Sequence, residues 1–467
     1  MDFSSYQSPF SWRYASTEMR ELWSEEYKIK LWRRVWVALA QAQHEAGLLT
    51  KAEIIDIKKH ATTIDIDRIF AIEKETRHDL MAAVKEFAEK AKVGGGKLHL
   101  GATSVDILDN AEIIRILEGL TIIEHKLRAL LLLFADKIKT YAKTPCLGFT
   151  HLQPAVPTTI GYRFAFYAQE LLENYRQLQW VKNNLKTKGF KGAVGSYASY
   201  EQLLHGKKMN ALEMEKNALQ QLGLTAFTVS NQVYSRQQDY IVISLLAQIA
   251  ASLYKCAADA RILQSPMFGE WQEEFGAKQV GSSAMPHKKN PVNAENICSL
   301  ARYITHLPPV MLENAMHSYL ERTLDDSANR RLVMPDAFLA TDHILRSSAR
   351  LIKNLDIKLP KIRYNLEQYY PFAACELVLL TAASRGADRQ LIHERIRNSA
   401  IDTWKQVEQG QKNQLFNLLK KDSLLQRYLT EKDFASWSVS GISLKAATSA
   451  ANRLSKLIYK EVETSTS

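Results

Sequence analysis

Residues 104–141, SVDILDNAEIIRILEGLTIIEHKLRALLLLFADKIKTY, decide the fold. Apolar residues recur along this stretch at steps of three or four, at Ile107, Ala111, Ile114, Leu117, Leu120, Ile123, Leu127, Leu130, Phe134, Ile138 and Tyr141. These steps place the apolar side chains on one face of an α-helix. Thr103 and Asp106 resemble a capping box at its start, with Asp in place of the usual Glu. The predicted helix is roughly 50–60 Å long.

The rest of the 467-residue chain also has a helical pattern. It contains only 19 glycines and 12 prolines, and proline is absent from residues 10–144, 158–265 and 372–467. Because glycine and proline are the strongest helix breakers, such long uninterrupted blocks predict helices. Further long helices are expected from about Gln237 to Gln264, from about Asn293 to Asn314, and after Pro335.

Helices of this length cannot bury a whole apolar stripe against a small domain, so they predict a bundle shared between subunits. We divide the chain into an N-terminal helical domain (1–103), a central long-helix bundle domain (104–356) and a C-terminal helical domain (357–467). Irregular, polar stretches separate the helices, and function is expected there. They are residues 8–17, 76–79, 101–104, 144–159 and 270–291.

Composition excludes several classes of protein. The net charge of +11 suits a small anionic ligand, and there is no basic block interleaved with aromatics that would predict a nucleic-acid partner. The longest apolar stretches, 127–135 and 240–254, are shorter than the ~20 residues of a membrane span. The first thirty residues lack a signal peptide, so we expect a soluble, cytoplasmic protein. Four scattered cysteines and the absence of HExxH predict no disulfide and no metal site.

Two histidines lie in the polar stretches. THLQPAVPTT (150–159) places His151 in a proline-constrained loop, and TRHDL (76–80) groups Arg77, His78 and Asp79. Either histidine could transfer protons near pH 7. The alternatives are a structural role for His151 and a solvated helix end at 76–80.

Two other segments supply hydrogen-bond donors for an anion. ERTLDDSANRR (321–331) contains Arg322, Ser327, Arg330 and Arg331, which could surround a phosphate or a carboxylate. WRYAS (12–16) adds Arg13 and Tyr14. The alternative for the first segment is a charged loop neutralised by its own Asp325 and Asp326.

The segment GSSAMPHKKNP (281–291) is the most specific of all. Serine is a base only if cations or backbone N–H groups stabilise its alkoxide. Lys288 and Lys289 are close in sequence, and a helix N-terminus expected near Asn293 would favour an anion. The alternative is a flexible linker, and we predict a mobile loop that closes over substrate.

GSSAMPHKKNP resembles the signature loop of the fumarase/aspartase superfamily and is most typical of its adenylosuccinate lyase family. Six other segments are similar to that family's motifs and follow in the same order: WRYAS, TRHDL, LGATSVDILDN, THLQPAVPTT, SNQVYSR and ERTLDDSANRR. The segment SRGADRQLIHERIR is similar to the family's C-terminal domain. The resemblance implies an all-α fold of three helical domains. It further implies a homotetramer with a twenty-helix core and active sites shared between three subunits.

The family reaction is the β-elimination of fumarate from adenylosuccinate, giving AMP, and from succinylaminoimidazole carboxamide ribotide. Carried over by position, the resemblance implies that Ser282 is the base and His151 the general acid. His78 would support the phosphate or the proton transfer. Lys288 and Glu295 would fix and polarise the site, Glu295 by holding His151.

The resemblance also implies a set of substrate contacts. The phosphate and ribose side of the nucleotide would contact Arg13, Tyr14, Arg322, Ser327 and Arg331. The rest of the substrate would contact Arg77, Asp79, Thr103, Ser104, Gln232 and Asn296, of which position 296 varies between Asn and Arg in the family. Lys288 and Asn290 would stabilise the dianion formed by proton removal. No metal or organic cofactor is implied.

Three alternatives stay open. Within the superfamily, the chain could be argininosuccinate lyase, aspartase or a carboxymuconate cycloisomerase, although WRYAS and ERTLDDSANRR favour a phosphate-bearing substrate. Outside that chemistry, it could be a non-catalytic protein on the same scaffold, or a nucleic-acid binder driven by charge.

Overall fold

The computed structural model describes residues 3–463. Helices dominate this part of the chain, and its strands form only two small two-stranded sheets. The predicted all-α fold class is therefore confirmed.

The N-terminal helices are α1 (Pro9–Trp12), α2 (Thr17–Leu22), α3 (Glu25–Glu45), α4 (Lys51–His60), α5 (Ile66–Thr76), α6 (Asp79–Lys90) and the 3₁₀-helix η1 (Gly95–Lys97). There follow α7 (Ser104–Tyr141), β1 (Pro145–Thr150), β2 (Gln153–Thr159), α8 (Ile160–Asn184), α9 (Ala198–Leu204), α10 (Ala211–Leu222), α11 (Gln237–Gln264), β3 (Trp271–Gln272), α12 (Val292–Thr305), α13 (Pro308–Met316) and α14 (Asp325–Asn354). The last elements are β4 (Asp356–Ile357), α15 (Leu359–Ala373), α16 (Cys375–Ser384), α17 (Arg389–Glu408), α18 (Leu415–Lys421), η2 (Leu425–Arg427), α19 (Glu431–Ser436), η3 (Val439–Gly441) and α20 (Lys445–Glu463).

Helix α7 confirms the prediction made from its apolar stripe. Its 38 residues correspond to roughly 57 Å. The Thr103 N–H donates to Asp106 Oδ2 at 3.0 Å, which is one half of the expected capping box. The stripe is buried along most of its length, for example at Ile114, Ile123 and Ile138. Helix α11 also has the predicted bounds.

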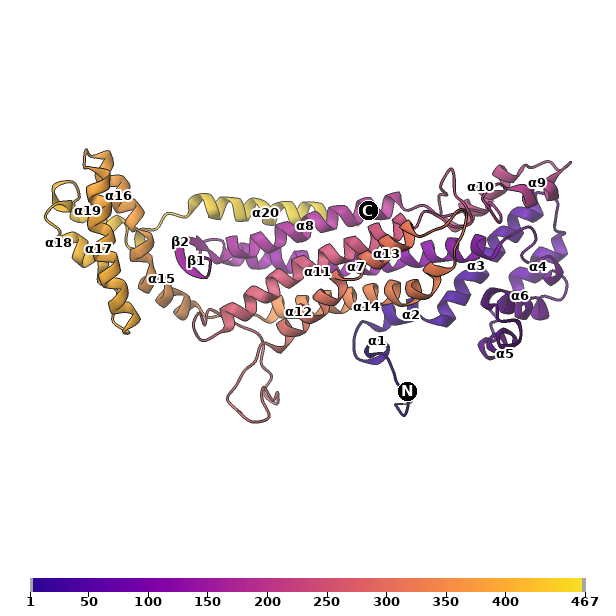
Figure 1. Ribbon diagram of the computed structural model, residues 1–467, viewed down its shortest axis with the longest axis horizontal. Coiled ribbons are helices and arrows are strands. Elements are labelled where there is room, and N and C mark those ends of the chain that lie inside the picture. Colours follow the sequence, from indigo (N-terminus) through magenta and orange to yellow (C-terminus); the bar gives the residue numbers. More distant parts are fainter. Residues whose placement is uncertain (1–2, 464–467) are drawn as a thin grey trace. The chain divides into compact units, whose positions relative to one another are not determined.

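The long helices α7, α8, α11 and α14 run alongside one another (Figure 1). Polar side chains join neighbouring helices: Gln179 of α8 donates to Glu124 of α7 at 2.6 Å, and Arg330 of α14 donates to Asp239 of α11 at 2.8 Å.

Two predicted helix boundaries are wrong, both because of proline. The helix expected over 293–314 is divided into α12 and α13, since Pro308 and Pro309 occupy the first turn of α13, where proline is tolerated, and cannot continue α12. The helix expected after Pro335 begins ten residues earlier, at Asp325, with Pro335 inside it. A single interior proline removes one backbone hydrogen bond, and here the helix continues past it.

The stretch 144–159 is not an irregular loop as predicted. Strands β1 and β2 form an antiparallel hairpin whose turn residues, His151 and Leu152, have φ of 54° and 59°. Positive φ at both central residues is the mark of a type I′ turn. Both strands of a two-stranded hairpin are edge strands. They can therefore contain prolines without the loss of a hydrogen bond that a central strand would need.

The chain packs into two compact units, and each is interleaved in sequence. The first comprises the residues up to Leu127, Asn174–Ala251 and Ser299–Arg346; the second comprises Arg128–Glu173, Ser252–Cys298 and the residues from Ser347 onward. Helices α7, α8, α11 and α14 each contribute to both units. The division into domains 1–103, 104–356 and 357–467 stays a prediction.

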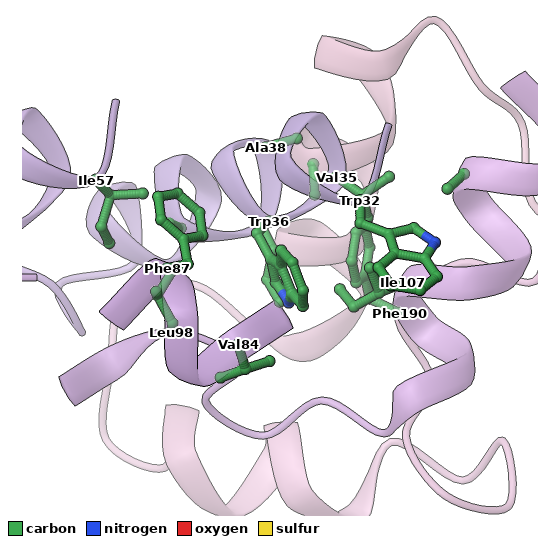
Figure 2. Packing of buried hydrophobic residues seen from close by; sticks show 14 of the residues in the cluster. Trp32, Val35, Trp36, Ala38, Ile57, Val84, Phe87, Leu98, Ile107 and Phe190 are labelled. Carbon is green, nitrogen blue, oxygen red and sulfur yellow. The ribbon is translucent and has the colours of Figure 1, made fainter. Parts of the chain in front are cut away.

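One apolar core of the first unit joins α3, α6 and the start of α7 (Figure 2). Trp36 and Phe87 meet with ring centroids 6.1 Å apart, and Ile107 and Phe190 belong to the same buried cluster. This core holds the segments before α6 and α7 in place, and both carry predicted site residues.

Of the described helices, only α11 is long and apolar enough to cross a membrane by length and composition. Within its apolar window, 56% of the residues are buried inside the chain.

Candidate active site

A cavity of about 160 Å³ lies in the first unit at the start of α14. Its lining includes four predicted substrate-binding residues, Asp79, Arg322, Ser327 and Arg331. The N-terminus of a helix attracts anions, and Arg binds phosphate with two parallel hydrogen bonds. The same lining also carries five carboxylates, those of Glu25, Asp79, Asp109, Glu112 and Asp326. That a phosphate binds here stays a prediction.

Carboxylates hold two of the three arginines predicted on the phosphate and ribose side, Arg322 and Arg331. Arg322 Nη1 donates to Asp326 Oδ1 at 3.0 Å, and Arg331 Nη2 donates to Asp79 Oδ2 at 3.4 Å. Burial by itself raises the pKa of the Asp326 carboxyl, but Arg236, Arg330 and Arg322 together hold that pKa below its ordinary value. Asp326 is therefore the ionised partner of Arg322.

His78 caps the N-terminus of α6 and faces Ser104. Its Nδ1 accepts the Met81 N–H at 3.4 Å, and its Nε2 lies 3.4 Å from Ser104 Oγ. An Nδ1 that accepts leaves the proton on Nε2 in the neutral ring, where it can be donated to Ser104. The structure therefore joins two predicted site residues from TRHDL and LGATSVDILDN.

Asp106 is a residue that sequence reasoning treated only as a helix cap. It is fully buried and accepts hydrogen bonds from the Thr103 N–H at 3.0 Å, the Gly192 N–H at 3.2 Å and the Lys188 ammonium. It thereby fixes the Thr103–Ser104 segment. The available signal was the group Asp106, Asp109 and Asn110, three polar residues close together at the start of the helix.

Arg330 also lines this cavity, but the other predicted residues of the first unit lie outside its lining. Gln232 donates from Nε2 to the Ala193 carbonyl at 3.0 Å. Tyr14 packs against His343 with ring centroids 4.8 Å apart, and Arg13 is exposed beside Trp12. Arg77 ends α5 with φ of 53° and is exposed.

The serine loop, residues 281–291, belongs to the second unit. Ser282 Oγ accepts the Met285 N–H at 3.0 Å and the Ala284 N–H at 3.4 Å. Asn290 Nδ2 donates to the Gly281 carbonyl at 2.8 Å and closes the loop, and a Cβ on Gly281 would collide with the Lys288 carbonyl oxygen. Two N–H donors aimed at Ser282 Oγ are what an alkoxide at that atom requires.

The helix N-terminus that follows the loop was expected to favour an anion and help to stabilise a serine alkoxide, but a carboxylate of the chain already occupies it. The Glu273 carboxylate accepts the N–H groups of Asn293 at 3.1 Å and Ala294 at 3.2 Å. These are the first-turn donors of α12, so Glu273 already satisfies them. Sequence reasoning missed this residue because it lies twenty positions before Asn293.

Lys288, Glu295 and Asn296 lie within and just after the loop. Lys288 and Glu295 are exposed and Asn296 is half-buried. The Glu295 carboxylate lies 3.9 Å from the Arg261 guanidinium. That Glu295 holds His151 stays a prediction.

His151 occupies the hairpin turn and lines a second cavity, of about 280 Å³, in the second unit. Arg163, Tyr167 and Asp259 line it too, and Tyr167 donates to Asp259 Oδ2 at 2.7 Å. Within the described residues, no hydrogen bond joins His151 to Ser282, whose oxygen is held by its own loop.

His99 lies just before the Thr103–Ser104 segment. The environment of its imidazole predicts that the folded protein loses stability in acid. Burial lowers its pKa below the ordinary value, with Asp106 opposing and His78 adding to the effect, and Nδ1 accepts the Trp36 indole N–H at 3.3 Å. As pH falls below about 6.5, the unfolded chain therefore binds a proton that the folded chain resists, and the unfolding free energy falls. His99→Asn, which suits its φ of 65°, should reduce this slope between neutral pH and pH ~5 in denaturant titrations. An unchanged slope would contradict the assignment.

Known proteins match the chain over most of its length. A family model described as Lyase matches residues 12–305. An adenylosuccinate lyase from Schistosoma mansoni is 37% identical over 426 residues, which cover 90% of this chain and 88% of that protein. An adenylosuccinate lyase from Archaeoglobus fulgidus is 36% identical over 425 residues, covering 91% of this chain and 92% of that protein.

Solved structures share the fold. A 3-carboxy-cis,cis-muconate lactonizing enzyme from Pseudomonas putida superposes with a TM-score of 0.85 at 23% identity, covering 98% of this chain and 100% of that one. A fumarate lyase from Mesorhizobium sp. BNC1 gives 0.83 at 24% identity, with coverages of 97% and 99%. With relatives above 30% identity along nine-tenths of its length, the chain belongs to the adenylosuccinate lyase family.

Proposed function

We propose that this lyase eliminates fumarate from adenylosuccinate, giving AMP, and from succinylaminoimidazole carboxamide ribotide in purine biosynthesis. The observation that carries the choice of substrate is the cavity at the start of α14, with Arg322, Ser327 and Arg331 in its lining. Argininosuccinate carries no phosphate to occupy such a site. The cavity therefore favours a nucleotide over the substrate of the nearest alternative.

The elimination needs a base and an acid. Ser282 Oγ, as the alkoxide, takes the proton from the succinyl carbon β to the nitrogen, and the electron pair moves into the adjacent carboxylate. The C–N bond then breaks as the electrons form the double bond of fumarate, and His151 protonates the departing amine. The N–H groups of Met285 and Ala284 support the alkoxide, and Lys288 and Asn290 stabilise the dianion.

The remaining residues bind and orient the substrate. His78 supports the phosphate or the proton transfer, and its contact with Ser104 favours a shared role. Glu295 polarises the site. The nucleotide contacts are Arg13, Tyr14, Arg322, Ser327 and Arg331, and the other contacts are Arg77, Asp79, Thr103, Ser104, Gln232 and Asn296.

The enzyme works as a cytoplasmic homotetramer whose active sites each draw on three subunits. Only 56% of the apolar window of α11 is buried inside one chain. Tyr162, Phe166 and Trp180 on α8 remain 44%, 51% and 58% exposed. Large apolar side chains left in water on long helices support a bundle completed by other subunits.

A substrate comparison tests the proposal. The purified protein is incubated with adenylosuccinate while the purine absorbance and the fumarate formed are followed. We expect AMP and fumarate in equal amounts, and no turnover of argininosuccinate. Turnover of argininosuccinate without conversion of adenylosuccinate would replace this proposal by the alternative.

A further inference from the structure

We infer that Arg236 is a positioning residue for the phosphate site: it engages Asp326 and thereby sets how strongly Asp326 holds Arg322. Arg236 ends the segment SNQVYSR (230–236), from which the proposed reaction uses only Gln232. The inference rests on the proposed function, because it assumes that Arg322 binds the phosphate of a nucleotide.

The guanidinium of Arg236 lies between two carboxylates. Its Nε donates to Asp326 Oδ2 at 2.7 Å, and its Nη1 lies 3.2 Å from both oxygens of Asp109. All three side chains are almost fully buried, at 4%, 2% and 3% exposure for Arg236, Asp109 and Asp326. The planar fork of an arginine suits this bridge, which the single ammonium of a lysine would not span.

Asp326 divides its two oxygens between two arginines. Oδ2 faces buried Arg236, whereas Oδ1 accepts from Arg322 at 3.0 Å. Arg322 is half-buried and lines the cavity with Ser327. Asp326 therefore connects the buried guanidinium of Arg236 to the guanidinium of Arg322, which binds the phosphate in the proposed function.

Removing the charge of Arg236 has a predictable direction. Asp326 would then have Arg322 as its direct partner and would hold it more tightly, away from a ligand. The cavity would also gain one uncompensated negative charge a few ångströms from the phosphate. Both effects weaken phosphate binding, and in a buried site such charges are poorly screened. Neither effect acts on a ligand without a phosphate.

The choice between Asp326 and Asp109 provides a matched control. Both are buried carboxylates in contact with Arg236, but only Asp326 contacts Arg322. Neutralising Asp326 in the Arg236→Gln background releases Arg322. Neutralising Asp109 removes the same charge from the same cluster but leaves the ion pair between Asp326 and Arg322 unchanged.

The test is calorimetric titration of the full-length protein with AMP and, as the phosphate-free control, with adenosine. Arg236→Gln should raise the dissociation constant of AMP by more than about tenfold and that of adenosine by less than about threefold. Adding Asp326→Asn should restore AMP binding to within about threefold of wild type. Adding Asp109→Asn should leave AMP binding as weak as in Arg236→Gln.

Equal AMP affinity in the two double variants would overturn the inference and make Arg236 merely structural. So would equal weakening of AMP and adenosine by Arg236→Gln. The two double variants decide the question even where the single variant unfolds, because each removes one positive and one negative charge. A wild-type protein that did not bind AMP would instead contradict the proposed function itself.

Discussion

Ser282→Ala should lower the kcat for adenylosuccinate cleavage by about 10³-fold or more while changing KM little. The serine oxygen is the atom that accepts the proton in the proposed reaction, and alanine has no group that can. Binding should survive, because none of the proposed phosphate contacts, which are Arg13, Tyr14, Arg322, Ser327 and Arg331, lies in the serine loop. Fumarate release at saturating substrate measures the effect.

Ser283→Ala is the matched control, because it removes a hydroxyl from the neighbouring position of the same loop. The backbone N–H groups of Ala284 and Met285 point to Ser282 rather than to Ser283. We therefore expect Ser283→Ala to retain most of its activity. If Ser283→Ala were the inactive variant and Ser282→Ala the active one, the base would be the second serine.

His151→Asn should lower kcat by about 10²-fold or more, because general acid catalysis contributes that much to proton transfers of this kind. Without an acid, the amine must leave unprotonated. Asparagine tolerates positive φ, so the variant should keep the hairpin turn, where φ is 54°. The measurement is again fumarate release under saturation.

Leu152→Asn controls for distortion of the turn, since Leu152 is the other turn residue and also has a positive φ, of 59°. It should remain active. His78→Asn is a second comparison, because asparagine can replace His78 as the cap of α6. Full activity in His151→Asn together with loss of activity in His78→Asn would transfer the acid role to His78.

Much of the helical architecture could be predicted from periodicity. The apolar stripe of α7 and the long uninterrupted run of α11 gave their bounds closely, since the two helices together contain one glycine and no proline. Prolines caused the errors, because a proline can begin a helix, as at α13, or lie inside one, as at Pro335. The hairpin at 145–159 was missed because strands this short and rich in proline carry no clear alternation.

The candidate site could be predicted only as separate segments. Local sequence identified the serine loop and ERTLDDSANRR, but the partners that hold them are distant in the chain. Asp109, Arg236 and Asp326 meet in space although about a hundred residues separate each from the next. No spacing rule reveals such pairs. Glu273 at the start of α12 escaped prediction for the same reason.

Mixing Ser282→Ala with His151→Asn tests most directly the proposal that each active site draws on several subunits, in the form that Ser282 and His151 of one site come from different subunits. The two inactive proteins are dissociated together, reassociated and assayed with adenylosuccinate. Random reassembly leaves both intact residues in about a quarter of the sites of a symmetric tetramer, so activity should recover to about that fraction of wild type. A mixture as inactive as either variant alone would contradict the account.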